Sequence, residues 1–321
     1  MTTPTHYWQY EQWTRKLHSL IAAGLCDEQE ADDLREQMDG MSDFLDEQEL
    51  YRLENLSGDL YMLSGEEVYI PTDMSEQAYT SNLFQSWSSQ DWDRVLNLLR
   101  MEVNVSSEHR AYLRARAYEE LHHVEAALLF VNHALKLDHS SSTYSYLAME
   151  LLEEAGHNEQ ALEQAEDWLT EADAPAGATI KSAAVLFGHT RNLSTTDARK
   201  YYQRVTAVLS DTLGKQEALS GLPRQVLALA YVVMGFSYRE LGSYAEAIES
   251  LREALKYNPH DVALQREIFS IQSGKASQSG ITGQSNFIVP KVTFDPSELP
   301  PSFDAQFFSS ALFSQGYALA I

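Results

Sequence analysis

Apolar residues recur every three or four positions along most of the chain, and short polar or glycine-containing breaks interrupt them. This spacing is typical of amphipathic α-helices, because it places the apolar side chains on one face. Three helix-length stretches also share one internal layout, at residues 119–135, 152–169 and 239–255. Self-similarity of this kind indicates stacked helical repeats, so we predict an all-α solenoid.

The shared layout consists of a turn residue, an alanine five positions later, and a second small or planar residue seven positions after that. These residues are, stretch by stretch, His122, Ala127 and Ala134; Gly156, Ala161 and Trp168; and Gly242, Ala247 and Ala254. Small side chains at such places let two antiparallel helices approach closely. The layout therefore predicts helix–turn–helix pairs.

The most regular unit begins at Ala228. Its small, aromatic and turn-forming residues are Tyr231, Met234, Gly235, Tyr238, Ala247, Leu251, Ala254 and Pro259. This pattern resembles the tetratricopeptide repeat family, whose 34-residue unit runs W-x2-L-G-x2-Y, then A-x3-F, A and P. The resemblance implies a right-handed α-solenoid of about five helix pairs.

Less regular units precede this one. In the same frame, units begin at Glu108 and Ser142, and looser ones lie near residues 75–101 and from about Ala178. Glu108 and Ala228 are 120 residues apart, 18 more than three repeats of this family require. We place the excess in residues 211–225, as a loop or a short extra helix, and expect a capping helix to begin at Asp261.

The first 73 residues differ in charge from the rest, with 17 of the 47 acidic residues and only four basic ones. An apolar stripe from Tyr7 to Ile21 predicts an amphipathic helix that ends near Gly24. Capping-box spacing at Asp27 with Glu30, and at Asp46 with Glu49, predicts two more helices. A helical region with a solvated acidic face is expected here.

The composition changes again after Ser273, to a Gly- and Ser-rich linker followed by the segment NFIVPKVTF and an apolar end. We predict three parts: an acidic N-terminal helical region at 1–73, a repeat array with a capping helix at 74–273, and a linker with an apolar, mostly irregular C-terminal tail at 274–321.

The formal charge of −24 narrows the range of partners. A strongly anionic chain repels nucleic-acid phosphates and anionic lipid headgroups, so neither nucleic acid nor membrane is an expected partner. Cys26 is the single cysteine and forms no internal disulfide, and no apolar run reaches membrane-spanning length. We expect a cytoplasmic protein.

No motif indicates catalysis, a metal or a cofactor. The densest histidine cluster, His122, His123, His133 and His139, spreads over a turn and the length of a helix, so we expect solvated side chains and not a metal site. The Gly274-Lys275 dipeptide lacks the other residues of a phosphate-binding loop. We therefore expect no enzymatic activity.

What the resemblance implies is a groove lined by the first helix of each repeat. Read position by position, its partner-binding residues are Tyr112, Arg116, Tyr146, Glu150, Val232, Phe236 and Arg239. The alternative is that these side chains pack on neighbouring helices. The Lys and Asn clamp with which some relatives hold acidic carboxy-termini is absent, since Tyr112 and Arg116 stand at its first two positions.

The function that this pattern favours is a non-enzymatic adaptor, scaffold or chaperone-like module that binds an apolar or basic peptide segment or helix. Two alternatives remain open at the level of sequence. One is a secretion-type chaperone or a regulatory subunit of an enzyme. The other is self-regulation, in which the tail beyond residue 274 docks in the groove. No motif specifies an oligomeric state.

Overall fold

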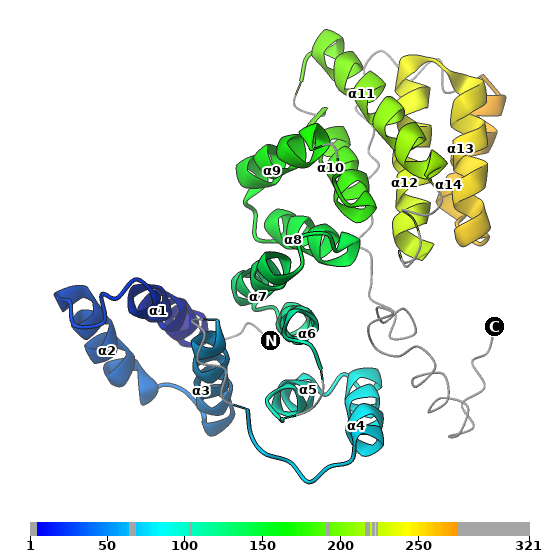
Figure 1. Cartoon of the computed structure of the whole chain (residues 1–321). Coiled ribbons are helices and arrows are strands. Elements are labelled where there is room, and N and C mark those ends of the chain that lie inside the picture. Colours follow the sequence, from blue (N-terminus) through cyan, green and yellow to red (C-terminus); the bar gives the residue numbers. More distant parts are fainter. Residues whose placement is uncertain are drawn as a thin grey trace. The chain divides into compact units, whose positions relative to one another are not determined.

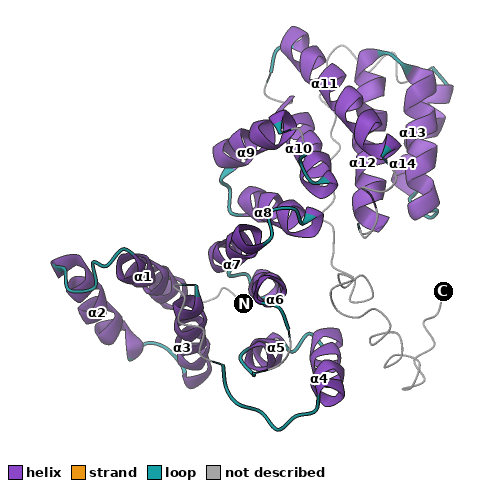
Figure 2. Ribbon diagram, in the orientation of Figure 1, coloured by secondary structure: helices purple, strands orange, loops and turns teal. Residues whose placement is uncertain are grey.

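The structure is a computed structural model, and it describes residues 5–63, 69–102, 105–171, 173–190, 193–215, 219, 222 and 224–274. Fourteen α-helices make up this described part, and the expected all-α fold of paired helices is confirmed (Figures 1 and 2). The apolar tail predicted beyond residue 274 lies outside the described residues. The chain divides into two compact units, Met1–Asn104 and Val105–Ile321.

The first unit contains five helices: α1 (Thr5–Ala22), α2 (Gln29–Ser42), α3 (Glu47–Met62), α4 (Glu76–Ser88) and α5 (Trp92–Leu99). The first helix ends as the sequence indicates, with Gly24 at φ +75° just beyond it. The helix pair near residues 75–101 forms, but it groups with the N-terminal helices. The predicted boundary between residues 73 and 74 differs from this grouping.

Only one of the two predicted capping boxes is present. The Asp46 side chain accepts a hydrogen bond from the Glu49 backbone N–H at 2.8 Å, and the Glu49 carboxylate accepts one from the Asp46 N–H at 3.0 Å. At the other site, Glu28 is the N-cap residue of α2 and its side chain makes no capping bond. The prediction for Asp27 and Glu30 is therefore wrong, because α2 begins one residue too late for Asp27 to cap it.

The second unit contains nine described helices, arranged as four pairs and a last helix. They are α6 (Ser107–Glu120), α7 (Val124–Leu137), α8 (Ser142–Glu154), α9 (Asn158–Thr170), α10 (Ala176–His189), α11 (Thr195–Gly214), α12 (Arg224–Leu241), α13 (Tyr244–Tyr257) and α14 (Val262–Gln272). Each packs against the next in chain order, and α10 also contacts α8 and α12 (Figure 1). The first helices of the last three pairs, α8, α10 and α12, are thus neighbours.

Small residues set the spacing within the last pair. A Cβ atom on Gly235 of α12 would lie only 2.7 Å from Leu251 Cδ2 and 3.3 Å from the Ala247 carbonyl oxygen, both on α13. Ala247, Leu251 and Ala254 are fully buried along the same seam. The close approach that the repeat pattern predicts at these positions is therefore present.

A long helix accounts for part of the 18 residues by which the distance from Glu108 to Ala228 exceeds three repeats. With 20 residues, α11 is six residues longer than α7 or α13, and it extends to Gly214. The predicted excess at 211–225 therefore begins inside a helix. At the far end, α14 starts at the predicted Asp261 cap, whose carboxylate accepts from the Ala263 and Leu264 backbone N–H groups.

Candidate protein-binding surface

The predicted groove residues lie on the first helices of three pairs, and most of them are buried. Tyr112, Arg116, Tyr146, Glu150, Val232 and Phe236 are each 2–6 % exposed, and Arg239 is half-buried. Such burial follows from the packing of each first helix against its own partner helix and, for α8 and α12, against the first helix α10. Glu153, one turn after Glu150 on α8, is accessible, with a side chain that is 38 % exposed.

Arg116 and Glu119 of α6 and Glu150 of α8 form a group of buried charged side chains, which we call the charged network. Arg116 and Glu119, one turn apart on α6, are joined by an ion pair of 2.8 Å, although their side chains are only 5 % and 0 % exposed. Burial lowers the pKa of the Arg116 guanidinium, whereas Glu119, Tyr112 and Glu150 raise it. The pKa is raised on balance, so Arg116 stays charged. Glu150 of α8 thus acts electrostatically on Arg116 of α6.

Lys181 extends this network to the third pair. Its ammonium group lies 2.6 Å from the Glu153 carboxylate and 5.5 Å from the centre of the Tyr146 ring. The Lys181 side chain is 5 % exposed, and it sits on α10, whose first residue follows that of α8 by 34 residues. Lys181 is absent from the predicted set, because groove residues were predicted only in the units that begin at Glu108, Ser142 and Ala228.

The aromatic members of the set are held in place by the same neighbours. The Tyr112 and Tyr144 ring centroids are 5.0 Å apart, which joins α6 to α8. Burial, together with Glu150 and Glu153, raises the pKa of Tyr146 well above its ordinary value, while Arg116 opposes the shift. The Tyr146 side chain is therefore neutral, with an apolar ring and a polar hydroxyl group.

Arg239 has a structural partner within the unit. Its guanidinium carbon lies 4.8 Å from the Phe236 ring centroid, and its Nη1 is 2.7 Å from the Glu267 carboxylate of α14. A further ion pair joins it to Glu240. Arg239 therefore fixes the last helix to α12, in addition to any contact it makes with a partner.

The histidines do not converge on an ion. Within the described ranges, no group of three or more His, Cys, Asp or Glu side chains could hold a metal. His122 is exposed in a turn at φ +65°, as expected, but His123 is buried at 4 % exposure. The expectation of a solvated His123 is wrong, because its ring packs edge-on to Tyr118 at 6.0 Å.

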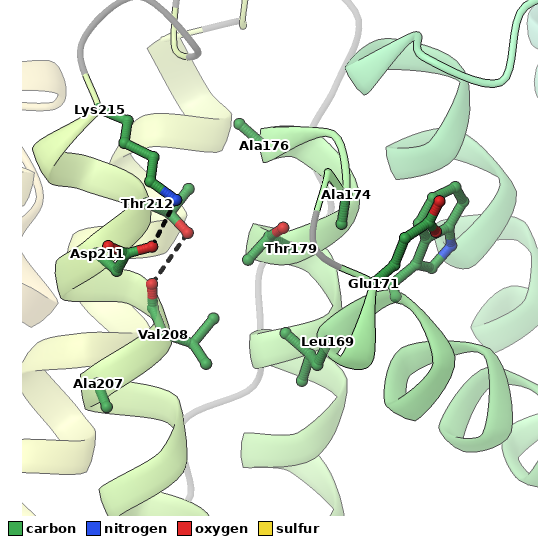
Figure 3. Close-up of a pocket in the computed structure, with 11 residues that line it drawn as sticks. Leu169, Glu171, Ala174, Ala176, Thr179, Ala207, Val208, Asp211, Thr212 and Lys215 are labelled. Carbon is green, nitrogen blue, oxygen red and sulfur yellow. Dashed lines mark hydrogen bonds and ion pairs between the residues drawn. The ribbon is translucent and has the colours of Figure 1, made fainter.

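A pocket of about 330 Å³ lies elsewhere in the second unit. The end of α9, the start of α10 and the last two turns of α11 enclose it, and Figure 3 shows the side chains of α11 facing Thr179 and Ala176. Its lining residues are Trp168, Leu169, Glu171, Ala174, Ala176, Thr179, Ala207, Val208, Asp211, Thr212 and Lys215. None of these residues belongs to the predicted groove set.

Comparison with known families identifies the repeat. The signature described as tetratricopeptide repeat matches residues 228–261, the span of α12, α13 and the turn after them. The chain thus contains a tetratricopeptide repeat. Tetratricopeptide repeats generally mediate protein–protein interactions and are typically non-enzymatic. The match begins at the residue that the sequence pattern predicts, Ala228, and it includes Val232, Phe236 and Arg239.

Other comparisons add little to this identification. The chain is similar to a solved structure described as the crystal structure of the P58(IPK) TPR domain, with 17 % identity over 84 % of this chain and 80 % of that one, and a TM-score of 0.28. No curated protein matches. Among the helices of the described part, none is long and apolar enough to cross a bilayer.

Proposed function

We propose that this protein is a non-enzymatic adaptor that binds a basic and partly apolar segment of another protein along the first helices α6, α8 and α10. The observation that supports this proposal is the group of charged side chains on these three helices, most of them buried, with Glu153 as the accessible member. Buried charges are costly to maintain, and replacing them by apolar residues often stabilises a protein. Their presence on successive first helices favours a role in recognition.

The charges of the network also indicate the kind of partner. Arg116, Glu119, Glu150 and Lys181 are buried, so the accessible charge of this group is the Glu153 carboxylate, whose side chain is 38 % exposed. A Lys or Arg of the partner would compete with Lys181 for Glu153 and then contact the Tyr146 ring. The overall charge of −24 would speed the approach of such a basic segment.

The test is capture of partners from the native host with the full-length protein as bait. Glu153→Lys should remove the specific partner, because the new ammonium repels its basic residue. Glu163→Lys is the matched control, since it makes the same charge change at an exposed site on the second helix α9. A partner retained by Glu153→Lys would exclude this surface, and a bait with no specific partner would contradict the adaptor function.

The same acidic surface would also suit a secretion-type chaperone or a regulatory subunit of an enzyme. A chaperone of this kind would hold unfolded export substrates and release them to a basic ATPase. If the captured proteins are such substrates, adding the ATPase should displace them. A single folded enzyme in the captured fraction would favour the regulatory subunit.

A further inference from the structure

The pocket between α9, α10 and α11 owes its depth to the long helix of the third repeat. The last six residues of α11, Leu209–Gly214, go beyond the length of α7 and α13. They carry Asp211 and Thr212, which form one wall. On the opposite side the chain supplies small residues, Ala174 and Ala176, so the wall faces open space and not a large side chain.

The chemistry of the lining is apolar inside and negatively charged at the edge. Leu169, Val208 and three alanines form the apolar part. The Thr179 and Thr212 hydroxyl groups donate to the carbonyl oxygens of Pro175 and Val208 at 3.1 and 2.9 Å, so towards the pocket they act as acceptors.

Three charged residues also line the pocket: Asp211 is paired with Lys215 at 2.7 Å, and the Glu171 carboxylate lies 3.6 Å from His139 Nε2. Such a site is suited to bind a segment in which an aliphatic side chain lies close to a positively charged side chain.

We propose that the occupant is the chain's own segment Asn286–Phe294, NFIVPKVTF. Residues 275–294 contain two lysines and no acidic residue, in a chain of net charge −24. Within the segment, Ile288 and Val289 supply adjacent aliphatic side chains, and Lys291 follows two residues later. The aliphatic pair fits the apolar lining, and the Lys291 ammonium complements the carboxylates of Glu171 and Asp211.

The connecting residues are long enough for this contact. Fourteen steps separate Gly274 from Ile288 and can span about 45 Å when extended. From α14 the path to α11 crosses α13 and α12, each in contact with the next, which amounts to about 30 Å at 8–10 Å per helix. A tether of this length gives an effective concentration on the order of millimolar, so a weak contact suffices.

This inference concerns a different surface from the proposed partner site. The pocket is lined by the end of α9, the first turn of α10 and the end of α11, whereas the charged residues of the partner site are Arg116 and Glu119 on α6, Glu150 and Glu153 on α8, and Lys181 further along α10. Variants in one leave the other unchanged, so the two proposals fail or succeed separately.

The experiment is photo-crosslinking within the full-length chain. Phe287→p-benzoylphenylalanine places a crosslinker beside Ile288, and mass spectrometry maps the attachment sites after irradiation. We expect intramolecular crosslinks to residues 168–179 and 207–215. Ala207→Trp fills the pocket from an exposed position and should lower their yield at least about tenfold.

Two further variants make the result specific. Gln203→Trp adds the same side chain one helical turn earlier, at an exposed residue outside the pocket, and should leave the yield unchanged. Lys291→Glu should lower the yield about threefold, because the new carboxylate repels Glu171 and Asp211. This variant changes nothing in the helices, so it keeps the test valid even if Ala207→Trp unfolds α11.

Other crosslinking results would overturn the proposal. Attachment to α6, to α8 or to α10 beyond Thr179 would place the segment in the groove. Crosslinks between two copies of the chain, detected by mixing isotope-labelled and unlabelled protein, would assign the pocket to self-association. Equal yields in Ala207→Trp and Gln203→Trp would show that the pocket does not hold the segment.

Discussion

Gly177 lies in the first turn of α10, where this helix meets the first residue of α8. A Cβ atom there would be 2.0 Å from the Ser142 carbonyl oxygen and 2.7 Å from its carbonyl carbon. Both atoms belong to the backbone, so a side chain at residue 177 can be accommodated only if the two helices move apart. The contact between the second and third pairs thus depends on the absence of a side chain at this residue.

We predict that Gly177→Ala destabilises the protein by about 3 kcal/mol, as in other overpacked sites. Gly188→Ala, in the same helix, is the control. No atom lies within 4 Å of its added Cβ, and the change should stabilise α10 by up to about 1 kcal/mol through helix propensity. Urea unfolding monitored by circular dichroism measures both, and equal effects would contradict the proposed close approach.

His18 is a second residue whose environment decides its behaviour. Its Nε2 lies 2.8 Å from Ser57 Oγ, and its ring packs edge-on to Tyr61 at 4.3 Å. Burial lowers the pKa of His18 from 6.5 to about 4. The folded protein therefore keeps this ring neutral at a pH where the unfolded chain binds a proton.

This shift predicts a loss of stability in acid. Between pH 6.5 and about 4 the unfolded state binds more protons at His18, so the free energy of unfolding falls as the pH falls. For a half-buried ring the loss is on the order of 2 kcal/mol. His18→Gln should remove this part of the pH dependence in thermal unfolding curves, whereas His6→Gln, at an exposed residue of the same helix, should leave it in place.

At the scale of elements, the start of α3 shows how a local pattern determines a helix end. Asp46 and Glu49 satisfy two backbone N–H groups that the helix itself leaves without a partner. The same spacing at Asp27 and Glu30 produces no such bonds, because Glu28 takes the N-cap position. Capping spacing is thus a reliable signal only where the helix begins at the matching residue.

We expect Asp46→Ala to destabilise the first unit by about 1 kcal/mol, the usual effect of losing an N-cap. The same substitution at Asp27 should change stability by no more than a few tenths of that amount. Hydrogen exchange of the first turn of α3 and of α2 separates the two cases. Equal protection losses at both sites would mean that the hydrogen bonds of Asp46 contribute nothing.

At the scale of the whole molecule, each compact unit has its own long-range contacts. In the first unit, Arg100 reaches from the end of α5 to α3. Its Nε and Nη2 lie 2.8 and 2.6 Å from the two Asp59 carboxylate oxygens, and its Nη1 is 2.8 Å from Asn55 Oδ1. The Asp59 side chain is fully buried. This pair joins segments that are about forty residues apart in the chain.

Arg100→Leu should destabilise the first unit by about 3–5 kcal/mol, because it leaves Asp59 buried without its cation. Hydrogen exchange should rise throughout α3 and α5 and stay unchanged in α12 and α13 of the second unit. Arg94→Leu, at an exposed residue of α5, is the control. Adding Asp59→Leu to Arg100→Leu should restore most of the protection, and failure to do so would indicate that the effect comes from lost packing.

The sequence by itself determined the helical repeats of this protein. The spacing of small residues at Gly235, Ala247 and Ala254 is a local property, since each pair of helices must pack on itself wherever the pair lies. For this reason the fold class, the unit that begins at Ala228 and the cap at Asp261 could all be predicted. The Asp46 cap and the end of α1 near Gly24 also depend only on neighbouring residues.

The tertiary structure decided which of the predicted groove side chains are exposed to solvent. A repeat pattern places Tyr112, Tyr146 and Phe236 on one face of their helices, but it does not contain the neighbours that bury that face. Lys181 joined the charged network only because α10 packs beside α8. The pocket likewise depends on α11 being longer than α7 and α13 and on the small residues Ala174 and Ala176 opposite it. Burial and cavities depend on how segments far apart in the sequence pack together, which local sequence patterns do not contain.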